Sequence, residues 1–321
     1  MAEQHSHKPG RSILQFSIEL MGMKKTMEKS ILNNSFSKEA ATLPASMCKR
    51  FEISTQTVKA RTVWSIAPKD NPEATLVIFL HGGAYYSNMT RMHWRLVEQL
   101  VISTGLRFIV PDYPLAPEAT CSEVYAFMDQ VYAQVTRDYP DSKIILMGDS
   151  AGGGLALGFA QYLHRDAGSK RQILDAPLSG GSSDVGQQFS SKQPQRIILL
   201  SSWLDISLTH PDIPELDKRD KILSVKGLKV AGVAYAGELE LTDYRVSPIN
   251  GPLDLKGKIA IFTGTNDLLL ADARNLKYLL ESRKMDFDYF EFPEMFHDWI
   301  LIPQLKETKQ AIVMIKDLLE Q

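Results

Sequence analysis

Short apolar runs alternate with helical patterns along the chain from Leu76 onward. Turn residues bound the apolar or alternating runs, which lie at residues 76–80, 107–110, 143–147, 196–200, 259–262 and 287–292. Such runs are typical of strands in a buried, parallel sheet. Between them, apolar side chains recur at helical spacing, as at residues 124–135, 276–280 and 311–319, which predicts helices that flank the sheet. The pattern indicates an α/β fold with a mostly parallel sheet.

The segment before the first of these strands has a different period. Polar and apolar side chains alternate over residues 57–66, as they do in an antiparallel strand with one face in water. We therefore expect this strand at the edge of a mixed sheet. Residues 51–75 then open a core domain that comprises residues 51–321.

Two segments do not fit the strand–helix alternation. In residues 1–50, apolar side chains from Ile13 to Ile31 recur at spacings of three and four, which predicts an amphipathic helix with no strand partner. Such a helix either packs on the outside of the core or forms a lid over a pocket, and we expect the lid. Residues 166–195 are rich in Ser, Gly and Gln, which indicates an inserted polar surface loop.

Composition and charge narrow the class of protein. The chain has 321 residues, 36 Lys and Arg, 38 Asp and Glu, and a formal net charge of −2. A basic stripe is absent from the sequence, so we expect no nucleic-acid partner. The polar N-terminus lacks the apolar core of a secretion signal, and no run approaches the ~18 apolar residues of a transmembrane segment. These features predict a soluble, cytoplasmic protein.

Motifs for bound groups are also absent from the sequence. Cys48 and Cys121 are too few for a disulfide framework. No H-E-x-x-H, C-x-x-C or Walker pattern occurs, so we expect neither a metal ion nor a cofactor.

A serine between glycines is the clearest chemical signal. Ser150 is the centre of Gly148-Asp-Ser-Ala-Gly152, which follows the run 143–147 and precedes a helical pattern. A serine on a sharp strand-to-helix turn projects its hydroxyl at the carboxyl edge of the sheet, beside the positive end of a helix dipole. This context predicts a nucleophile rather than an ordinary glycine-rich turn.

A second glycine motif agrees with this interpretation. His81-Gly82-Gly83 directly follows the run 76–80, so its amides lie at the same sheet edge as Ser150. The backbone N–H groups of Gly82 and Gly83, with that of Ala151, can converge on one oxygen and stabilise an oxyanion. The alternative is a tight turn with no chemical role.

A serine nucleophile needs a base and an orienting acid. Among the seven histidines, His297 follows the run 287–292 by a short loop and so reaches the carboxyl edge. Asp267 lies just after the run 259–262, whereas its competitor Asp272 begins a helical pattern and is explained as a helix cap or a partner of the helix dipole. The chain order Ser150, Asp267, His297 is that of the strand–turn–helix nucleophile fold.

These residues resemble the hormone-sensitive-lipase-like branch of the α/β-hydrolase fold, which contains many bacterial carboxylesterases. The resemblance covers residues 76–299 and rests on His81-Gly-Gly-Ala84, Asp112-Tyr-Pro-Leu-Ala-Pro-Glu118, Gly148-Asp-Ser-Ala-Gly-Gly153, Ser202-Trp-Leu-Asp205, Asp267-Leu-Leu269 and Phe296-His297. It implies an eight-stranded, mostly parallel sheet and a helical cap, built here from residues 1–50 and 206–225.

The sequence departs from the family pattern at two places. Ser202 stands where the family usually has proline, and Asp272 lies one residue farther from Asp267 than the family's second acid. Neither departure touches a proposed catalytic atom. Asp112 and Glu118 are interpreted as hydrogen-bonding struts of a rigid loop, and Trp203 and Asp205 as structural residues.

The residues and the resemblance together predict a serine carboxylesterase. We expect it to hydrolyse small-molecule esters with short to medium acyl chains through an acyl-enzyme intermediate. Amide hydrolysis or acyl transfer by the same residues is an alternative, and so is a small-molecule receptor, against which the intact His297 argues. The sequence leaves open whether the chain is a monomer or a homodimer.

Overall fold

The computed structural model describes residues 22–69, 74–168 and 192–320. Its centre is an eight-stranded sheet in the order β1-β2-β4-β3-β5-β6-β7-β8. The strands are β1 (Glu52–Val58), β2 (Arg61–Ala67), β3 (Thr75–Leu80), β4 (Arg107–Pro111), β5 (Lys143–Asp149), β6 (Arg196–Leu200), β7 (Lys258–Gly264) and β8 (Phe287–Phe292). β2 runs antiparallel to both of its neighbours, and all the other pairs are parallel. The predicted α/β-hydrolase sheet is therefore confirmed.

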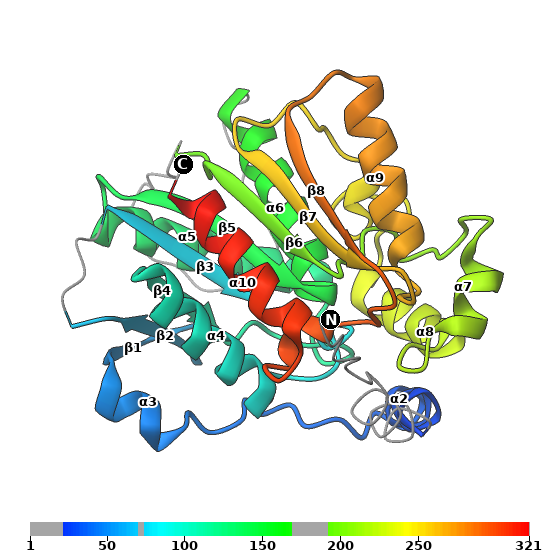
Figure 1. Cartoon of the computed structure of the whole chain (residues 1–321), viewed down its shortest axis with the longest axis horizontal. Helices are drawn as coiled ribbons and strands as arrows, with labels where there is room; N and C mark the ends of the chain where they lie inside the picture. Colours follow the sequence, from blue (N-terminus) through cyan, green and yellow to red (C-terminus); the bar gives the residue numbers. More distant parts are fainter. Residues whose placement is uncertain (1–21, 70–73, 169–191, 321) are drawn as a thin grey trace, which may run out of the picture.

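Helices cover both faces of this sheet (Figure 1). One apolar cluster joins the sheet to α5 (Cys121–Asp138), α6 (Ser150–Gly168) and α9 (Leu270–Ser282). A second cluster, on the other face, joins it to α4 (Arg91–Thr104) and α10 (Lys306–Leu319). Strands between two such layers have both faces buried, which explains their nearly continuous apolar sequences. Within the described ranges, no helix is both long and apolar enough to cross a membrane.

The predicted single strand 57–66 is wrong in its bounds, because the chain forms a β-hairpin there. Val58 pairs with Arg61 across Lys59 and Ala60, whose φ angles are 44° and 61°. Two consecutive residues with positive φ make the tight turn that joins antiparallel strands. The alternation of polar and apolar side chains continues through so short a turn, so this pattern alone does not reveal where one strand ends and the next begins. The antiparallel edge itself was predicted correctly.

Three further helices lie together beside the carboxyl edge of the sheet: α2 (Met23–Leu32), α7 (Ile213–Arg219) and α8 (Val225–Ala236) (Figure 1). The second segment predicted for the cap, 206–225, contains α7 but ends where α8 begins, so this helical part extends farther along the chain. Of the predicted N-terminal stripe, Ile13 lies outside the described residues, and Ile31 is buried against α8. Most of the insertion 166–195 also lies outside them, although residues 166–168 continue α6.

The remaining short elements complete the chain. α3 (Ala45–Arg50) precedes β1, η1 (Pro248–Asn250) precedes β7, and η2 (Trp299–Leu301) precedes α10. Cys48 is exposed and Cys121 is buried, and both are free thiols.

Candidate active site

Ser150 occupies a strained turn between β5 and α6. Its φ is 50°, an uncommon conformation for a residue with a side chain. The turn closes tightly, because a Cβ on Gly148 would lie 2.3 Å from the carbonyl oxygen of Gly152. A Cβ on Gly152 would in turn lie 2.0 Å from the carbonyl oxygen of Leu80. Glycines at these positions let strand, turn and helix approach closely enough to hold the serine in place.

The structure brings Ser150, His297 and Asp267 together. His297 Nε2 lies 2.9 Å from Ser150 Oγ, and His297 Nδ1 lies 3.1 Å from each carboxylate oxygen of Asp267. Asp267 is reached from the end of β7, and His297 from the loop after β8. All three residues are buried. This chain of contacts can move a proton from the hydroxyl to the imidazole while the carboxylate holds the ring.

The glycine loop lies against Ser150. Leu80 is in register with Gly148, so the residues that follow β3 and β5 are neighbours. A Cβ on Gly82 would lie 3.0 Å from Ser150 Cβ, and Gly83 has a φ of +122°, in the region that favours glycine. Ala151 follows Ser150 in the first turn of α6, where backbone N–H groups have no partner within the helix. Two of the predicted amide donors thus belong to the loop after β3, and the third belongs to the residue that follows Ser150.

Aromatic stacking supports this loop from the helices beside the sheet edge. The ring of Tyr85 is parallel to that of Tyr235 in α8, with 3.6 Å between the centroids. Behind the loop, His81 stacks on Tyr113 at 4.3 Å. Burial and the neighbouring His93 lower the pKa of His81 to about 3, so the ring is neutral at ordinary pH.

The sequence interpretation of Asp272 as a helix cap is wrong, although the residue does lie in the first turn of α9, where a partner of the helix dipole is expected. Leu269 occupies the N-cap position of α9, and no side chain caps it. Asp272 Oδ2 instead accepts the backbone N–H groups of Leu204 and Asp205 at 2.9 and 3.0 Å. Burial, together with the charge of Asp205, raises the pKa of Asp272 to about 8. These hydrogen bonds hold the loop after β6, whereas the carboxylate on His297 Nδ1 is that of Asp267.

Asp220, which the sequence analysis did not single out, links α7 to the loop of Asp267. One carboxylate oxygen accepts the N–H groups of Ile222 and Leu223, and the other accepts that of Leu268 at 2.7 Å. Burial and the charge of Asp267 raise the pKa of Asp220 to about 6. No periodic pattern marks such a residue, because its partners are backbone groups distant in sequence.

Asp298 was also missed, although it directly follows His297. Its Oδ2 lies 3.1 Å from His297 Nε2, the atom that faces Ser150. Nearby, His93 Nε2 lies 3.2 Å from Oδ2 of Asp149. Burial acts to lower the pKa of His297, but the charges of Asp298 and then Asp267 raise it well above its ordinary value. The site is therefore richer in carboxylates than the sequence analysis predicted.

The residues interpreted as structural have structural contacts. Asp112 Oδ1 accepts hydrogen bonds of 2.6 Å from both Arg61 and Asn88. Glu118 accepts one from Asn34 at 3.0 Å. Trp203 is fully buried, and its indole donates to the carbonyl of Asp205.

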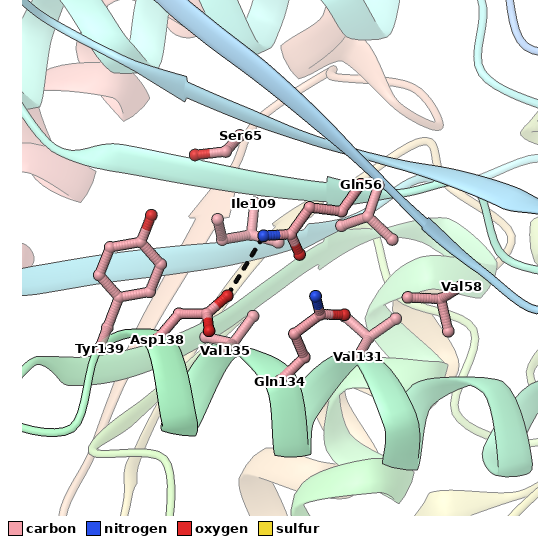
Figure 2. A pocket seen from close by; sticks show the side chains of 10 residues that line it. Gln56, Val58, Ser65, Ile109, Val131, Gln134, Val135, Asp138 and Tyr139 are labelled. Atoms are coloured by element: carbon pink, nitrogen blue, oxygen red, sulfur yellow. Dashed lines mark hydrogen bonds between the residues drawn. The ribbon is translucent and has the colours of Figure 1, made fainter.

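No cluster of three or more metal-ligating side chains occurs among the residues that the structure describes. A pocket lies between β1, β2, β4 and α5 and is lined by residues such as Gln56, Ser65 and Asp138 (Figure 2), and Ser150 is not part of its lining. Its volume of about 20 Å³ has room for about one water molecule. It is too small for an ester substrate.

Comparison with known proteins agrees with this geometry. The sequence model of the α/β-hydrolase fold matches residues 77–301, which include Ser150, Asp267 and His297. The chain belongs to the α/β-hydrolase family. An esterase from Acinetobacter venetianus is 27% identical over 254 residues, which cover 78% of this chain and 76% of that protein. A putative acetyl-hydrolase, LipR, from Mycobacterium tuberculosis is 28% identical over 256 residues, 78% of this chain and 74% of its own length.

A solved structure of similar fold is an esterase from the bacterial hormone-sensitive lipase family. It superposes with a TM-score of 0.74 at 21% identity, and the match covers 99% of this chain and 98% of that one. This structural likeness shows the fold, while the type of enzyme is inferred from the relatives found by sequence. This α/β hydrolase is a carboxylic ester hydrolase of the esterase and lipase type.

Proposed function

We propose that this α/β hydrolase is a serine carboxylesterase acting on short to medium acyl esters through an acyl-enzyme. The observation that carries the proposal is the buried contact of Ser150 Oγ with His297 Nε2, continued by His297 Nδ1 to Asp267. A serine hydroxyl is a weak nucleophile unless a base takes its proton. The esterase and acetyl-hydrolase relatives support an ester as the substrate.

In the proposed mechanism, Ser150 Oγ attacks the ester carbonyl carbon while its proton passes to His297 Nε2. The backbone N–H groups of Gly82, Gly83 and Ala151 stabilise the oxyanion of the tetrahedral intermediate. His297 then gives the proton to the leaving alcohol, and Asp267 holds the ring in the required tautomer. Water activated by His297 attacks the acyl-enzyme, which releases the acid and restores Ser150.

Hydrolysis of p-nitrophenyl acetate and butyrate tests this function. Ser150→Ala is expected to lower kcat by about 10⁴-fold or more, as loss of a triad nucleophile does. A phosphonate or sulfonyl fluoride is expected to label Ser150 in the wild-type protein, which peptide mass spectrometry locates. Wild-type rates near those of the uncatalysed reaction on all short esters favour the receptor alternative. Faster turnover of matched amides, or transfer to an added alcohol in preference to water, favours the amidase or acyltransferase.

A further inference from the structure

His297 Nε2 faces two different oxygen atoms. Ser150 Oγ lies 2.9 Å away and Asp298 Oδ2 lies 3.1 Å away. A hydroxyl can donate to an unprotonated nitrogen, whereas an ionised carboxylate can only accept from a protonated one. The two neighbours therefore favour opposite protonation states of the same atom.

The doubly protonated ring is fully paired in this arrangement. Nδ1–H donates to Asp267 and Nε2–H donates to Asp298, so both N–H groups of the imidazolium have an ionised acceptor. In the neutral ring, the Nε2 lone pair faces Ser150 but also the negative charge of Asp298. Asp298 thus stabilises the form of His297 that cannot take the proton of Ser150.

The backbone directs Asp298 to this position. Its φ of 53° is left-handed, and its N–H donates to Ser201 Oγ at 3.3 Å. Asp298 is the N-cap residue of η2 but makes no side-chain capping bond there. Within the described residues, Oδ1 has no hydrogen-bond partner. The carboxylate is therefore committed to the imidazole rather than to the local backbone.

Other charged groups around the ring do not duplicate this contact. Asp267 binds the opposite nitrogen, Asp149 is paired with His93 of α4, and Asp220 at the end of α7 binds backbone N–H groups. The charge of Asp298 makes the largest contribution to raising the pKa of His297, against the lowering effect of burial. The side chain is 17% exposed, so the pair can exchange protons with solvent.

We propose that Asp298 is a positioning residue that holds a proton on His297 Nε2 and so sets the pH above which His297 serves as a base. This rests on the proposed function of Ser150 and His297. Below that pH, Asp298 pairs with the imidazolium and the enzyme is inactive. Above it, the Nε2 proton leaves to solvent, and the freed lone pair accepts the proton of Ser150.

The test compares the pH dependence of kcat/KM in wild type and Asp298→Asn. Asparagine tolerates left-handed backbone and is nearly isosteric, so it removes the charge without straining the turn. In Asp298→Asn, we expect the acidic limb of the pH profile, where kcat/KM rises with pH, to move about 1–2 pH units lower. The reason is that an opposite charge at this distance shifts the pKa of a group such as His297 by roughly 1–3 units. At the foot of the wild-type limb, kcat/KM then rises about 10- to 100-fold. NMR titration of the His297 ring is expected to show the same shift without any substrate.

Asp220→Asn is the matched control, since it removes another buried carboxylate of this site that does not touch Nε2. It is expected to move the limb less than Asp298→Asn. A limb and a ring titration unchanged in folded Asp298→Asn overturn the proposal, and so does an equal shift in Asp220→Asn. The proposed function fails by a different result, namely esterase activity retained in Ser150→Ala. In that case the NMR titration of the His297 ring still tests the effect of Asp298, because it needs no substrate.

Discussion

At the scale of single residues, two residues with left-handed backbone contact the same nitrogen of the candidate site. Ser150 and Asp298 have φ angles of 50° and 53°, and their side chains meet at His297 Nε2. Such conformations persist only where the surrounding structure imposes them. Close glycine contacts impose the first, and the bond from Asp298 N–H to Ser201 contributes to the second. The two strained residues, Ser150 and Asp298, thus carry the two side chains that compete for His297 Nε2.

The assignment of Asp267 as the acid of the triad can be tested against Asp272. Both aspartates are buried, Asp267 in the loop after β7 and Asp272 in the helix α9 that follows it. Asp267→Asn is expected to present the wrong imidazole tautomer to Ser150 and to lower kcat by about 10³- to 10⁴-fold. Asp272→Asn keeps an acceptor oxygen for Leu204 and Asp205, so its kcat near neutral pH is expected to stay within about threefold of wild type. Steady-state kinetics on p-nitrophenyl butyrate measure both. If the two losses are exchanged, Asp272 is the acid.

At the scale of elements, α2 is attached to the helices beside the sheet edge. Lys24 bonds Asp217 of α7 at 2.7 Å, and Glu28 accepts from Ser224, the N-cap of α8, at 2.5 Å. A Cβ on Gly227 would lie 3.2 Å from Ile31 Cδ1, so α2 and α8 approach closely at this glycine. Since α8 also stacks Tyr235 on Tyr85 beside the glycine loop, a change at the α2–α8 contact can reach the site.

Gly227→Leu tests whether α2 acts as a lid. The larger side chain overpacks the contact, which is expected to lower stability by about 1–3 kcal/mol and to displace α2 from α8. If α2 lines the acyl pocket, the butyrate-to-acetate ratio of kcat/KM falls. Val233→Leu on the same helix, where the side chain is 58% exposed, is expected to change neither property. A ratio unchanged in folded Gly227→Leu identifies α2 as a buttress.

At the scale of the whole molecule, the carboxyl edge of the sheet gathers buried acids. Burial raises the pKa of Asp220 and of Asp298 to about 6 and that of Asp272 to about 8. A folded acid with a raised pKa holds its proton at a pH where the unfolded chain has lost it, so these groups make stability fall as pH rises. Arrangements of this kind are concentrated at functional sites, where charge has to be moved during a reaction.

Asp272 makes this effect measurable. Its ordinary pKa of 3.8 is raised to about 8, so between these values the folded state binds more protons. The contribution of Asp272 to the free energy of unfolding is largest below the pKa of the unfolded state. It is lost as the pH rises through the pKa of the folded state, by at most about 1.4 kcal/mol per pH unit. Asp272→Asn cannot ionise, so we expect its Tm to fall less than that of wild type from about pH 5 to about pH 8. Parallel Tm curves contradict this assignment.

Local patterns in the sequence were enough to predict the six parallel strands and the chain order of the proposed triad, while the count of eight strands came from the resemblance. The inner parallel strands are buried on both faces and are therefore apolar runs, whereas the edge strand β8 alternates and is only partly buried. Ser150, Asp267 and His297 each follow one of these strands. Parallel strands align their carboxyl ends, so residues after different strands reach one edge of the sheet. The expected positions of these three residues thus follow from local patterns alone, even though Ser150 and His297 are 147 residues apart.

The partners of the other polar groups could be found only in the folded structure. Asp272 has the sequence context of a helix cap but binds the loop after β6, and Asp298 has that of a cap but faces the imidazole. Periodicity records which face of an element is buried, and it carries no information about which distant atom a short polar side chain meets. Those contacts depend on how loops from β5, β6, β7 and β8 are placed once the sheet has closed around its core. The protonation of His297 therefore depends both on Asp298, beside it in the same loop, and on Asp267 from the loop after β7.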